Sequence, residues 1–433
     1  MSSTFRSLAG INYRLWFAGA LVSNIGTWMQ RTAQDWIVLT ELTDNDAAAV
    51  GFTMALQLGP QLLLVPFSGL IADRFDKRRL LLATNLVMGI LAVGLGALTL
   101  SGAAELWHVY LFALALGITS AIDAPARQAF VSELVSEKNL PNAVSLNSAS
   151  FNGARLVGPA VAGILTASVG AGWVFLINAV TFAATLAALM LLRRNELRPS
   201  PRAARGRGQL LKGLTYVRSR ADLVVIFIIV FLIGTFGLNF PIFAATMASV
   251  EFHHGAGEFG LLSSVLAIGS LTGALLSARR ERPRMRTVFL SAAAFGVTLA
   301  IASVMPTYWS FAISLIFVGF TAITLMTTAN SVVQTRTAPE MRGRVMALYL
   351  AIFMGGTPLG APIVGFVANE LGPRWALGVG ASAGLLAALV GLVYLVRERG
   401  LRLHYDRGFS LTWTDRERAR EKLAADESAV PRG

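Results

Sequence analysis

The sequence predicts an all-α polytopic membrane protein with twelve transmembrane helices arranged as two pseudo-symmetric six-helix bundles. Three observations indicate this fold. Of the 433 residues, 55% are apolar and only 14% are charged, which leaves too little polar surface to cover soluble domains of this length. Twelve mostly apolar segments reach the ~20 residues that a spanning helix needs. In addition, a sequence pattern from the first half recurs in the second.

The expected spans divide into two sets of six. The first set covers residues 14–40, 50–72, 80–100, 106–128, 144–168 and 172–192, and the second covers 222–248, 258–278, 286–305, 307–335, 343–368 and 374–396. Between the sets, Pro199, Pro201 and several arginines give the composition of a linker. We therefore expect an N-terminal bundle at 1–192, a cytoplasmic linker at 193–221, a C-terminal bundle at 222–396 and a cytoplasmic tail at 397–433.

The recurring pattern lies in the fifth span of each set. At one constant offset, the first copy matches the second in Leu146 and Leu348, Phe151 and Phe353, Gly153 and Gly355, Gly158 and Gly360, and Gly163 and Gly365. Parallel repeats of this kind are typical of transporters whose two halves rock around a central site.

Basic residues predict the orientation, because Lys and Arg near helix ends stay on the cytoplasmic side. One set of alternating connections carries Arg74, Lys77, Arg78 and Arg79, residues 193–220 and 279–286, and Arg336, Arg342 and Arg344. The opposite set has Arg374 and the acids Glu41, Asp44, Asp46, Glu105, Glu251 and Glu258. Both termini are therefore expected in the cytoplasm of a bacterial cell, with the chain in the inner membrane. In the tail, residues 414–417 predict either a capping box that opens a short helix or an unstructured segment.

Several classes of function are disfavoured by composition. The chain has no cysteine and four scattered histidines, so we expect no metal site and no cofactor. The net charge of +13 comes from short segments between apolar runs, which argues against nucleic-acid binding. There is no phosphate-binding loop and no nucleophile elbow, so neither ATP drive nor an integral membrane enzyme is supported.

The segment from Gly69 to Arg79, Gly-Leu-Ile-Ala-Asp-Arg-Phe-Asp-Lys-Arg-Arg, follows the second span on the cytoplasmic side. It resembles the signature loop of the major facilitator superfamily, with Asp76 where that family usually has glycine. The resemblance implies a twelve-helix transporter fold. It also implies a gate between the halves, for which we expect the signature residues Gly69, Asp73, Arg74, Lys77 and Arg78, together with Asp123 at the inner end of the fourth span.

The fifth span contains Gly153, Gly158, Pro159 and Gly163, a pattern that resembles the Gly-Pro motif of exporters in this superfamily. Ordinary packing of small residues is the alternative reading. Segments around residues 12–36, 125–130 and 140–142 further resemble the branch that contains the enterobactin exporter and related drug/proton antiporters. Ala113 stands where the family usually has an arginine in the fourth span. This difference weakens the inference that this chain uses the family's complete proton-relay mechanism.

Charged residues inside spans are costly and therefore candidates for function. Arg31 and Asp35 lie one turn apart in the first span, and Arg155 lies in the fifth. We expect these three to couple transport to protons. The alternative is that Asp35 lies at the membrane interface, has its hydrogen bonds satisfied there and takes no part in coupling. Residues that could contact substrate are Asn24, Gln34, Gln57, Gln61, Asn147, Asn152, Arg155, Asn239 and Gln334, although hydrogen bonding between helices explains each amide equally well.

Taken together, the residues and the resemblance predict a monomeric secondary exporter of small amphipathic molecules, of the multidrug efflux type that confers drug resistance. Protons are the expected coupling ion, and the substrate and the lipid bilayer are the expected partners. A dedicated siderophore exporter is the first alternative, and an uptake carrier or uniporter is the second.

Overall fold

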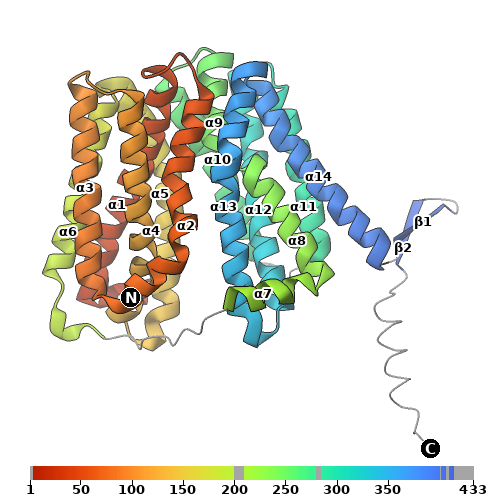
Figure 1. Ribbon diagram of the computed structural model, residues 1–433, viewed down its shortest axis with the longest axis horizontal. Coiled ribbons are helices and arrows are strands. Elements are labelled where there is room, and N and C mark those ends of the chain that lie inside the picture. Colours follow the sequence, from red (N-terminus) through yellow and green to blue (C-terminus); the bar gives the residue numbers. More distant parts are fainter. Residues whose placement is uncertain (1–2, 199–208, 279–283, 400, 406–408, 414–433) are drawn as a thin grey trace, which may run out of the picture.

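The computed structural model consists almost entirely of long helices (Figure 1). It describes residues 3–198, 209–278, 284–399, 401–405 and 409–413, and it describes side chains there except at 3–4, 65–73, 209–211, 278, 398–399 and 401–413. The first half contains α1 (Ile11–Thr40), α2 (Ala47–Arg74), α3 (Lys77–Leu100), α4 (Leu106–Leu134), α5 (Leu140–Val169) and α6 (Ala171–Leu191). Short 3₁₀ segments cover Ser3–Ala9, Glu137–Asn139 and Arg194–Glu196.

The second half begins with a helical path that changes type several times. α8 (Ala221–Leu232) continues into a π-helical segment, η4 (Ile233–Gly237), and α9 (Phe240–Thr246) continues into a second one, η5 (Met247–Glu251). The path is interrupted at Leu238 and Asn239, next to Gly237 and just before Pro241. Proline lacks the N–H that a continuous helix would need, so this expected single span is a broken one.

The remaining helices are α10 (Ala256–Ala278), α11 (Met285–Ser303), α12 (Tyr308–Arg336), α13 (Pro339–Leu371) and α14 (Pro373–Arg399). Ten segments of the described part are long and apolar enough to cross a membrane by length and composition. α1 and α5 are not among them, and they carry the charged residues considered below. The all-α polytopic fold is thus confirmed, with a short hairpin of β1 (Leu401–Tyr405) and β2 (Phe409–Trp413) after α14. Residues 414–417 lie outside the described residues.

The two halves repeat one packing scheme. In the first, α1 packs on α5 and α6, α2 on α4, and α3 on α4 and α6. In the second, α8 and η4 pack on α13 and α14, α10 on α12, and α11 on α12 and α14. The halves meet along two seams, α2 against α13 and α5 against α10. This arrangement matches the repeat that the sequence predicts in the fifth span of each set.

Part of the predicted linker is also helical. Residues Gln209–Arg218 form α7, which packs on α13. Val217 is buried there, and Gly213 lies against Arg344 and Leu348 of α13. Close approach at the glycine and burial of the valine explain why this piece of the linker docks on the second half.

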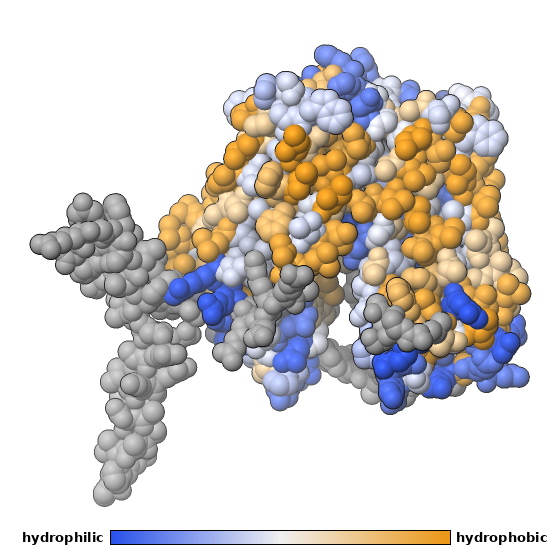
Figure 2. Space-filling view, turned by 180° about the vertical axis from the view of Figure 1, so that it is seen from behind, coloured by the Kyte–Doolittle hydropathy of each residue, from blue (hydrophilic) through white to orange (hydrophobic). Residues whose placement is uncertain are grey.

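The outside of the molecule carries a band of apolar side chains between two polar ends (Figure 2). Leu63, Ile164, Val180 and Leu290 are among the large apolar residues with exposed side chains. We call the end with Arg74, Lys77 and Arg79 the basic face, and the end with Asp46, Glu251 and Glu258 the acidic face. α7 lies at the basic face (Figure 1), where a notch separates the two halves (Figure 2).

Candidate substrate cavity

A cavity of about 250 Å³ lies between the two halves. Its wall on the first half comes from α1, α2 and α5, and its wall on the second half comes from the α8–α9 region, α10 and α13. The lining residues are Trp28, Arg31, Thr32, Asp35, Met54, Gln57, Leu58, Arg155 and Pro159, with Leu238, Phe240, Pro241, Phe259, Ser263, Leu266, Ala267, Ser270, Phe353 and Thr357. A cavity at the seam has the position that alternating access requires, since either end of the seam can open onto it.

All charges among the described lining residues belong to the first half. They are Arg31, Asp35 and Arg155. Both guanidinium groups lie against the ring of Trp28, with their central carbons 5.3 Å and 5.6 Å from its centroid. None of the ion pairs within 4 Å in the described part of the chain includes any of the three charged residues. The aromatic ring therefore holds the two arginines, while their N–H groups stay available.

Two polar atoms in this wall are buried without a partner in the described structure. They are Nε of Arg31 and Nε2 of Gln57, and both are hydrogen-bond donors. A buried donor that stays unpaired costs about 1–3 kcal/mol, so such atoms require an explanation. Because both residues line the cavity, a ligand or a water molecule in the cavity can supply the missing hydrogen-bond acceptor.

Among the described lining residues, those from the second half carry no charge and three hydroxyl groups. Ser263 donates to the carbonyl of Phe259 at 3.2 Å, Ser270 to that of Leu266 at 3.0 Å, and Thr357 to that of Gly234 at 3.2 Å. Each hydroxyl has thereby used its proton and retains lone pairs. The rings of Phe240, Phe259 and Phe353 make up much of the remaining surface. This wall is therefore apolar, with accepting oxygens.

The Gly-Pro motif on α5 seats Trp28 beside the cavity. A Cβ atom at Gly158 would lie 2.5 Å from Cβ of Trp28 and 3.1 Å from the carbonyl oxygen of Ile25, so α1 could not approach as it does. Pro159 lines the cavity itself, and Gly163 lies against Ala256 of α10. At Gly153 an added Cβ would meet nothing within 4 Å. Three of the four predicted motif residues thus have a packing or lining role here.

Contacts between the halves close the cavity toward the acidic face. The side-chain amide of Asn369 in α13 donates to a carboxylate oxygen of Asp46 at 2.6 Å and accepts from the backbone N–H of Ala47 at 2.8 Å. Ser249 donates to Asn45 at 2.7 Å. Deeper in, the ring of Trp36 stacks on that of Phe259, which lines the cavity, at a centroid distance of 5.6 Å. The structure is therefore closed at the acidic face.

The predicted proton-coupling residues Arg31, Asp35 and Arg155 come together in the cavity wall. Of the predicted substrate contacts, Gln57 and Arg155 line it, whereas the other amides do not. Asn24 donates to Ser150 of α5, Asn152 to the carbonyl of Ser148, and Gln334 to Asn330. Asn147 accepts from Tyr13, Asn239 donates to the carbonyl of Thr235, Gln34 is buried in α1, and Gln61 is half-buried on α2.

The signature loop is attached to its own half. Arg78 donates to the carbonyls of Leu189 and Met190 at 2.7 Å and 3.3 Å, and Lys77 pairs with Glu133 of α4 at 2.6 Å. Asp123 is paired with Arg127 at 2.8 Å rather than with Arg78. Arg74 is exposed, and the side chains of residues 69 and 73 lie outside the described residues. With the halves apart at the basic face, the gate stays a prediction.

Sequence reasoning missed several lining residues, including Trp28, Phe353 and Thr357. The repeat contained a signal for Thr357. Gly360 minus Gly158 gives an offset of 202, and the same offset relates Arg155 to Thr357. Both members of this pair line the cavity.

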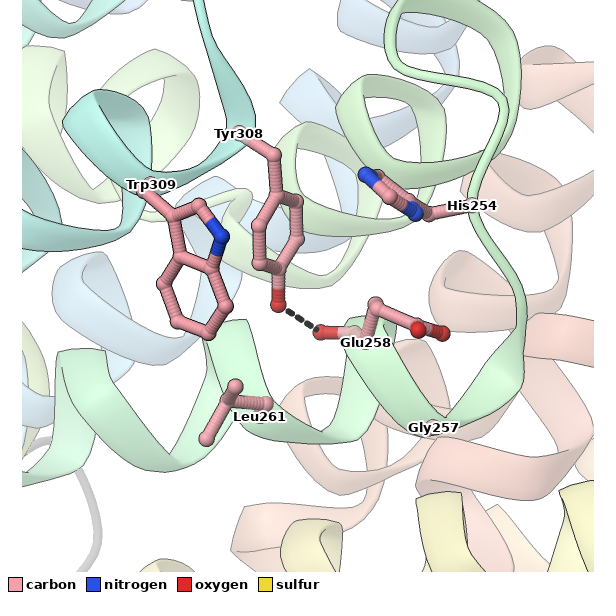
Figure 3. Close-up of a pocket in the computed structure, with 6 residues that line it drawn as sticks. All are labelled: His254, Gly257, Glu258, Leu261, Tyr308 and Trp309. Carbon is pink, nitrogen blue, oxygen red and sulfur yellow. Dashed lines mark hydrogen bonds between the residues drawn. The ribbon is translucent and has the colours of Figure 1, made fainter.

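A second pocket, of about 200 Å³, lies at the acidic face of the second half (Figure 3). Tyr308 of α12 donates there to the carbonyl oxygen of Glu258 in α10 at 2.9 Å, and its ring lies 4.7 Å from that of His254. The side chain of Trp309 is 66% exposed. All the described lining residues of this pocket come from the second half. The pocket therefore does not lie at a seam between the halves, as the central cavity does.

A family model described as transmembrane secretion effector matches residues 2–404. The chain belongs to the transmembrane secretion effector family. Its relatives in the major facilitator superfamily include the staphyloferrin A transporter of Staphylococcus aureus (strain NCTC 8325 / PS 47), 26% identical over 363 residues that cover 83% of this chain and 90% of the relative. The enterobactin exporter EntS of Salmonella paratyphi A (strain ATCC 9150 / SARB42) is 25% identical over 363 residues, 83% of this chain and 86% of the relative.

Solved structures agree on the fold of this transmembrane secretion effector. A POT family transporter in complex with 5-aminolevulinic acid has a TM-score of 0.70 at 13% identity and covers 89% of this chain and 96% of its own. An inward-facing, occupied bacterial homolog of the human lysosomal transporter Spinster has a TM-score of 0.66 at 16% identity, with 91% and 97% covered. The chain is therefore a multi-pass membrane transporter of the efflux and secretion type, and family membership argues against an enzyme.

Proposed function

We propose that this chain exports small amphipathic molecules through the central cavity by alternating access, in exchange for protons that move inward. The observation that carries the proposal is the cavity at the seam, with charges on one wall and aromatic rings on the other. Such a lining suits a molecule with a polar end and an apolar end. Closure at one face and a notch at the other match one of the two states that alternating access needs.

The proposed orientation places the basic face in the cytoplasm of a bacterial inner membrane. Basic residues near helix ends favour the cytoplasmic side, and Lys77 and Arg78 lie at this face while Glu251 and Glu258 lie at the other. Arg374 at the acidic face is neutralised by Glu251, since their N···O distance is 2.8 Å. In this orientation the present state receives substrate from the cytoplasm, and both termini are cytoplasmic.

Asp35 is the residue proposed to carry the proton. It is the one acidic residue among the described lining residues of the cavity, it is 8% exposed, and no described residue hydrogen-bonds its carboxylate. Arg31 lies one turn before it on α1. Protonation would change the charge of the cavity wall and could therefore shift the balance between the two facing states.

Transport into proteoliposomes under an imposed pH gradient tests this function. Purified protein is screened with dyes, drugs and catecholates, while an internal dye reports proton movement. We expect substrate flux to require the gradient, and Asp35→Asn to abolish substrate-driven proton movement. Asp44→Asn, an exposed acid just after α1, is the matched control. Proton movement that persists fully in the Asp35 variant would show that Asp35 is not the carrier.

Dedicated siderophore export is the second candidate, and it is favoured by the two relatives named for staphyloferrin A and enterobactin. The same vesicles separate it from multidrug efflux. Broad dye transport that an uncoupler abolishes supports the multidrug type, whereas transport restricted to catecholates or other siderophores supports the dedicated type. Accumulation driven in the opposite direction would instead indicate an uptake carrier.

A further inference from the structure

The two walls of the cavity carry different hydrogen-bonding groups. Arg31 and Gln57 each bury an unpaired donor, and no described group pairs with Arg155 by a hydrogen bond or an ion pair. The cation–π contact with Trp28 is an attraction to the face of the ring and not a hydrogen bond to a described acceptor, so the two guanidinium groups keep N–H groups available for a ligand. The described residues of the first-half wall therefore present donors, with Asp35 as their one acidic acceptor.

The opposite wall presents acceptors. The hydroxyl protons of Ser263, Ser270 and Thr357 are directed to helix carbonyls, and their lone pairs are left for a further partner. The other lining groups on this side are apolar. A ligand that satisfies both walls must accept at one end and donate at the other, across an apolar middle.

The net charge of the cavity lining follows from its three described charged residues, Arg31, Asp35 and Arg155. With Asp35 ionised, two arginines and one carboxylate sum to +1, and with Asp35 protonated they sum to +2. The wall is thus positive in either protonation state. An anion relieves the repulsion between the arginines, whereas a cation adds to it.

We infer that the cavity selects an amphipathic anion, whose anionic group binds Arg31, Arg155 and Gln57 and whose far end carries hydroxyl or N–H donors toward Ser263, Ser270 and Thr357. This inference rests on the proposed function and names the substrate class of that same site. It assigns Trp28 the role of a positioning residue, which keeps the two guanidinium groups at a shared anion.

Four naphthalene probes test the inference by equilibrium binding to the full chain in nanodiscs. They are 6-hydroxy-2-naphthoate, 2-naphthoate, 6-hydroxy-2-naphthamide and 2-naphthylmethylammonium. We expect affinity to fall in that order. Arg31→Gln and Arg155→Gln should each weaken both naphthoates by about ten- to a hundredfold, the range for hydrogen bonds to charged groups, and should change the amide by less than about threefold. Thr357→Val should reduce the advantage of the hydroxylated naphthoate severalfold.

Arg14→Gln removes an exposed arginine from the same helix, α1, and should leave all four affinities unchanged. The inference is overturned if the ammonium binds as tightly as the naphthoates, if the cavity arginine variants weaken the amide equally, or if neither naphthoate binds at millimolar concentration. Flux of the same probes in proteoliposomes separates the two claims. Selective binding without flux contradicts the proposed function alone, and flux without preference for anions contradicts the inference alone.

Discussion

The two halves of this transporter pack their helices in the same way but line the cavity with opposite chemistry. Arg155 on α5 and Thr357 on α13 are related by the repeat offset and both face the cavity. One is a donor with a full charge, and the other is a hydroxyl whose proton is already used. The repeat therefore preserves the packing of the helices, while the chemistry of the cavity depends on the positions at which the two copies differ.

Glycines at equivalent positions show which contacts the two copies of the repeat share. Gly163 lies against α10 and Gly365 against α2. Glycines at equivalent positions of the repeat therefore pack at both seams between the halves. Gly158 lies against α1, and Gly360 lies against Thr235 of η4, which occupies the corresponding place in the second half. Close backbone approach is thus common to both halves, because small residues are needed wherever helices touch this closely.

Exchange of the divergent pair should have the largest effect. We expect Arg155→Thr to lower anion transport by more than about tenfold, because it makes the α5 wall resemble the α13 wall. Adding Thr357→Arg to that variant should not restore transport, since Arg31 and Gln57 stay on the first wall. Initial rates of naphthoate flux in proteoliposomes measure both variants. Full rescue by the double exchange would mean that only the number of arginines matters.

Substitution at the shared glycines should have an intermediate effect. A Cβ at Gly163 would lie 2.8 Å from the carbonyl oxygen of Ala256 and 3.0 Å from Cα of Gly260, and backbone atoms cannot give way easily. Gly163→Ala and Gly365→Ala should therefore each destabilise the protein by about 1–3 kcal/mol, the usual cost of overpacking. Thermal melting monitors this loss. Gly153→Ala, on the same helix but facing open space, is the control, and equal melting of the two α5 variants would contradict the packing argument.

Loosening the contact at the acidic face should have the smallest effect. Asn369→Ala removes two hydrogen bonds, to Asp46 and to the N–H of Ala47, each worth about 0.5 kcal/mol at this exposed site. We expect the population open at the acidic face to rise severalfold. Because the chain has no cysteine, spin labels at Asp44→Cys and Glu370→Cys report the distance between the halves without background. An unchanged distance distribution would show that this contact does not hold the seam.

Helical segments and the repeat were predictable from sequence because hydrophobic length and glycine spacing are local properties. The interruption near Asn239, the helix at residues 209–218 and the hairpin after α14 were not predicted. Each depends on tertiary partners. α7, for instance, is too short to be stable alone and is held by α13.

Within the site, the charged candidates were predictable and most of the amides were not. Burying a charge is costly enough that Arg31, Asp35 and Arg155 had to face one another or a cavity. An amide has cheaper options, as Asn24 shows by bonding Ser150 and Asn152 by bonding its own helix. Sequence alone does not fix the rotation of a helix, and a shift of one residue turns a side chain by about 100°.

The closed seam also determines where the membrane voltage falls. In the proposed orientation the cavity shares the electrical potential of the cytoplasm, so the insulating layer lies between Trp36 and the Asp46–Asn369 contact. A monovalent ligand that crosses this layer gains or loses about 2.3 kcal/mol per 100 mV. An inside-negative voltage therefore drives a bound anion outward across this closed contact layer and opposes the outward movement of a cation.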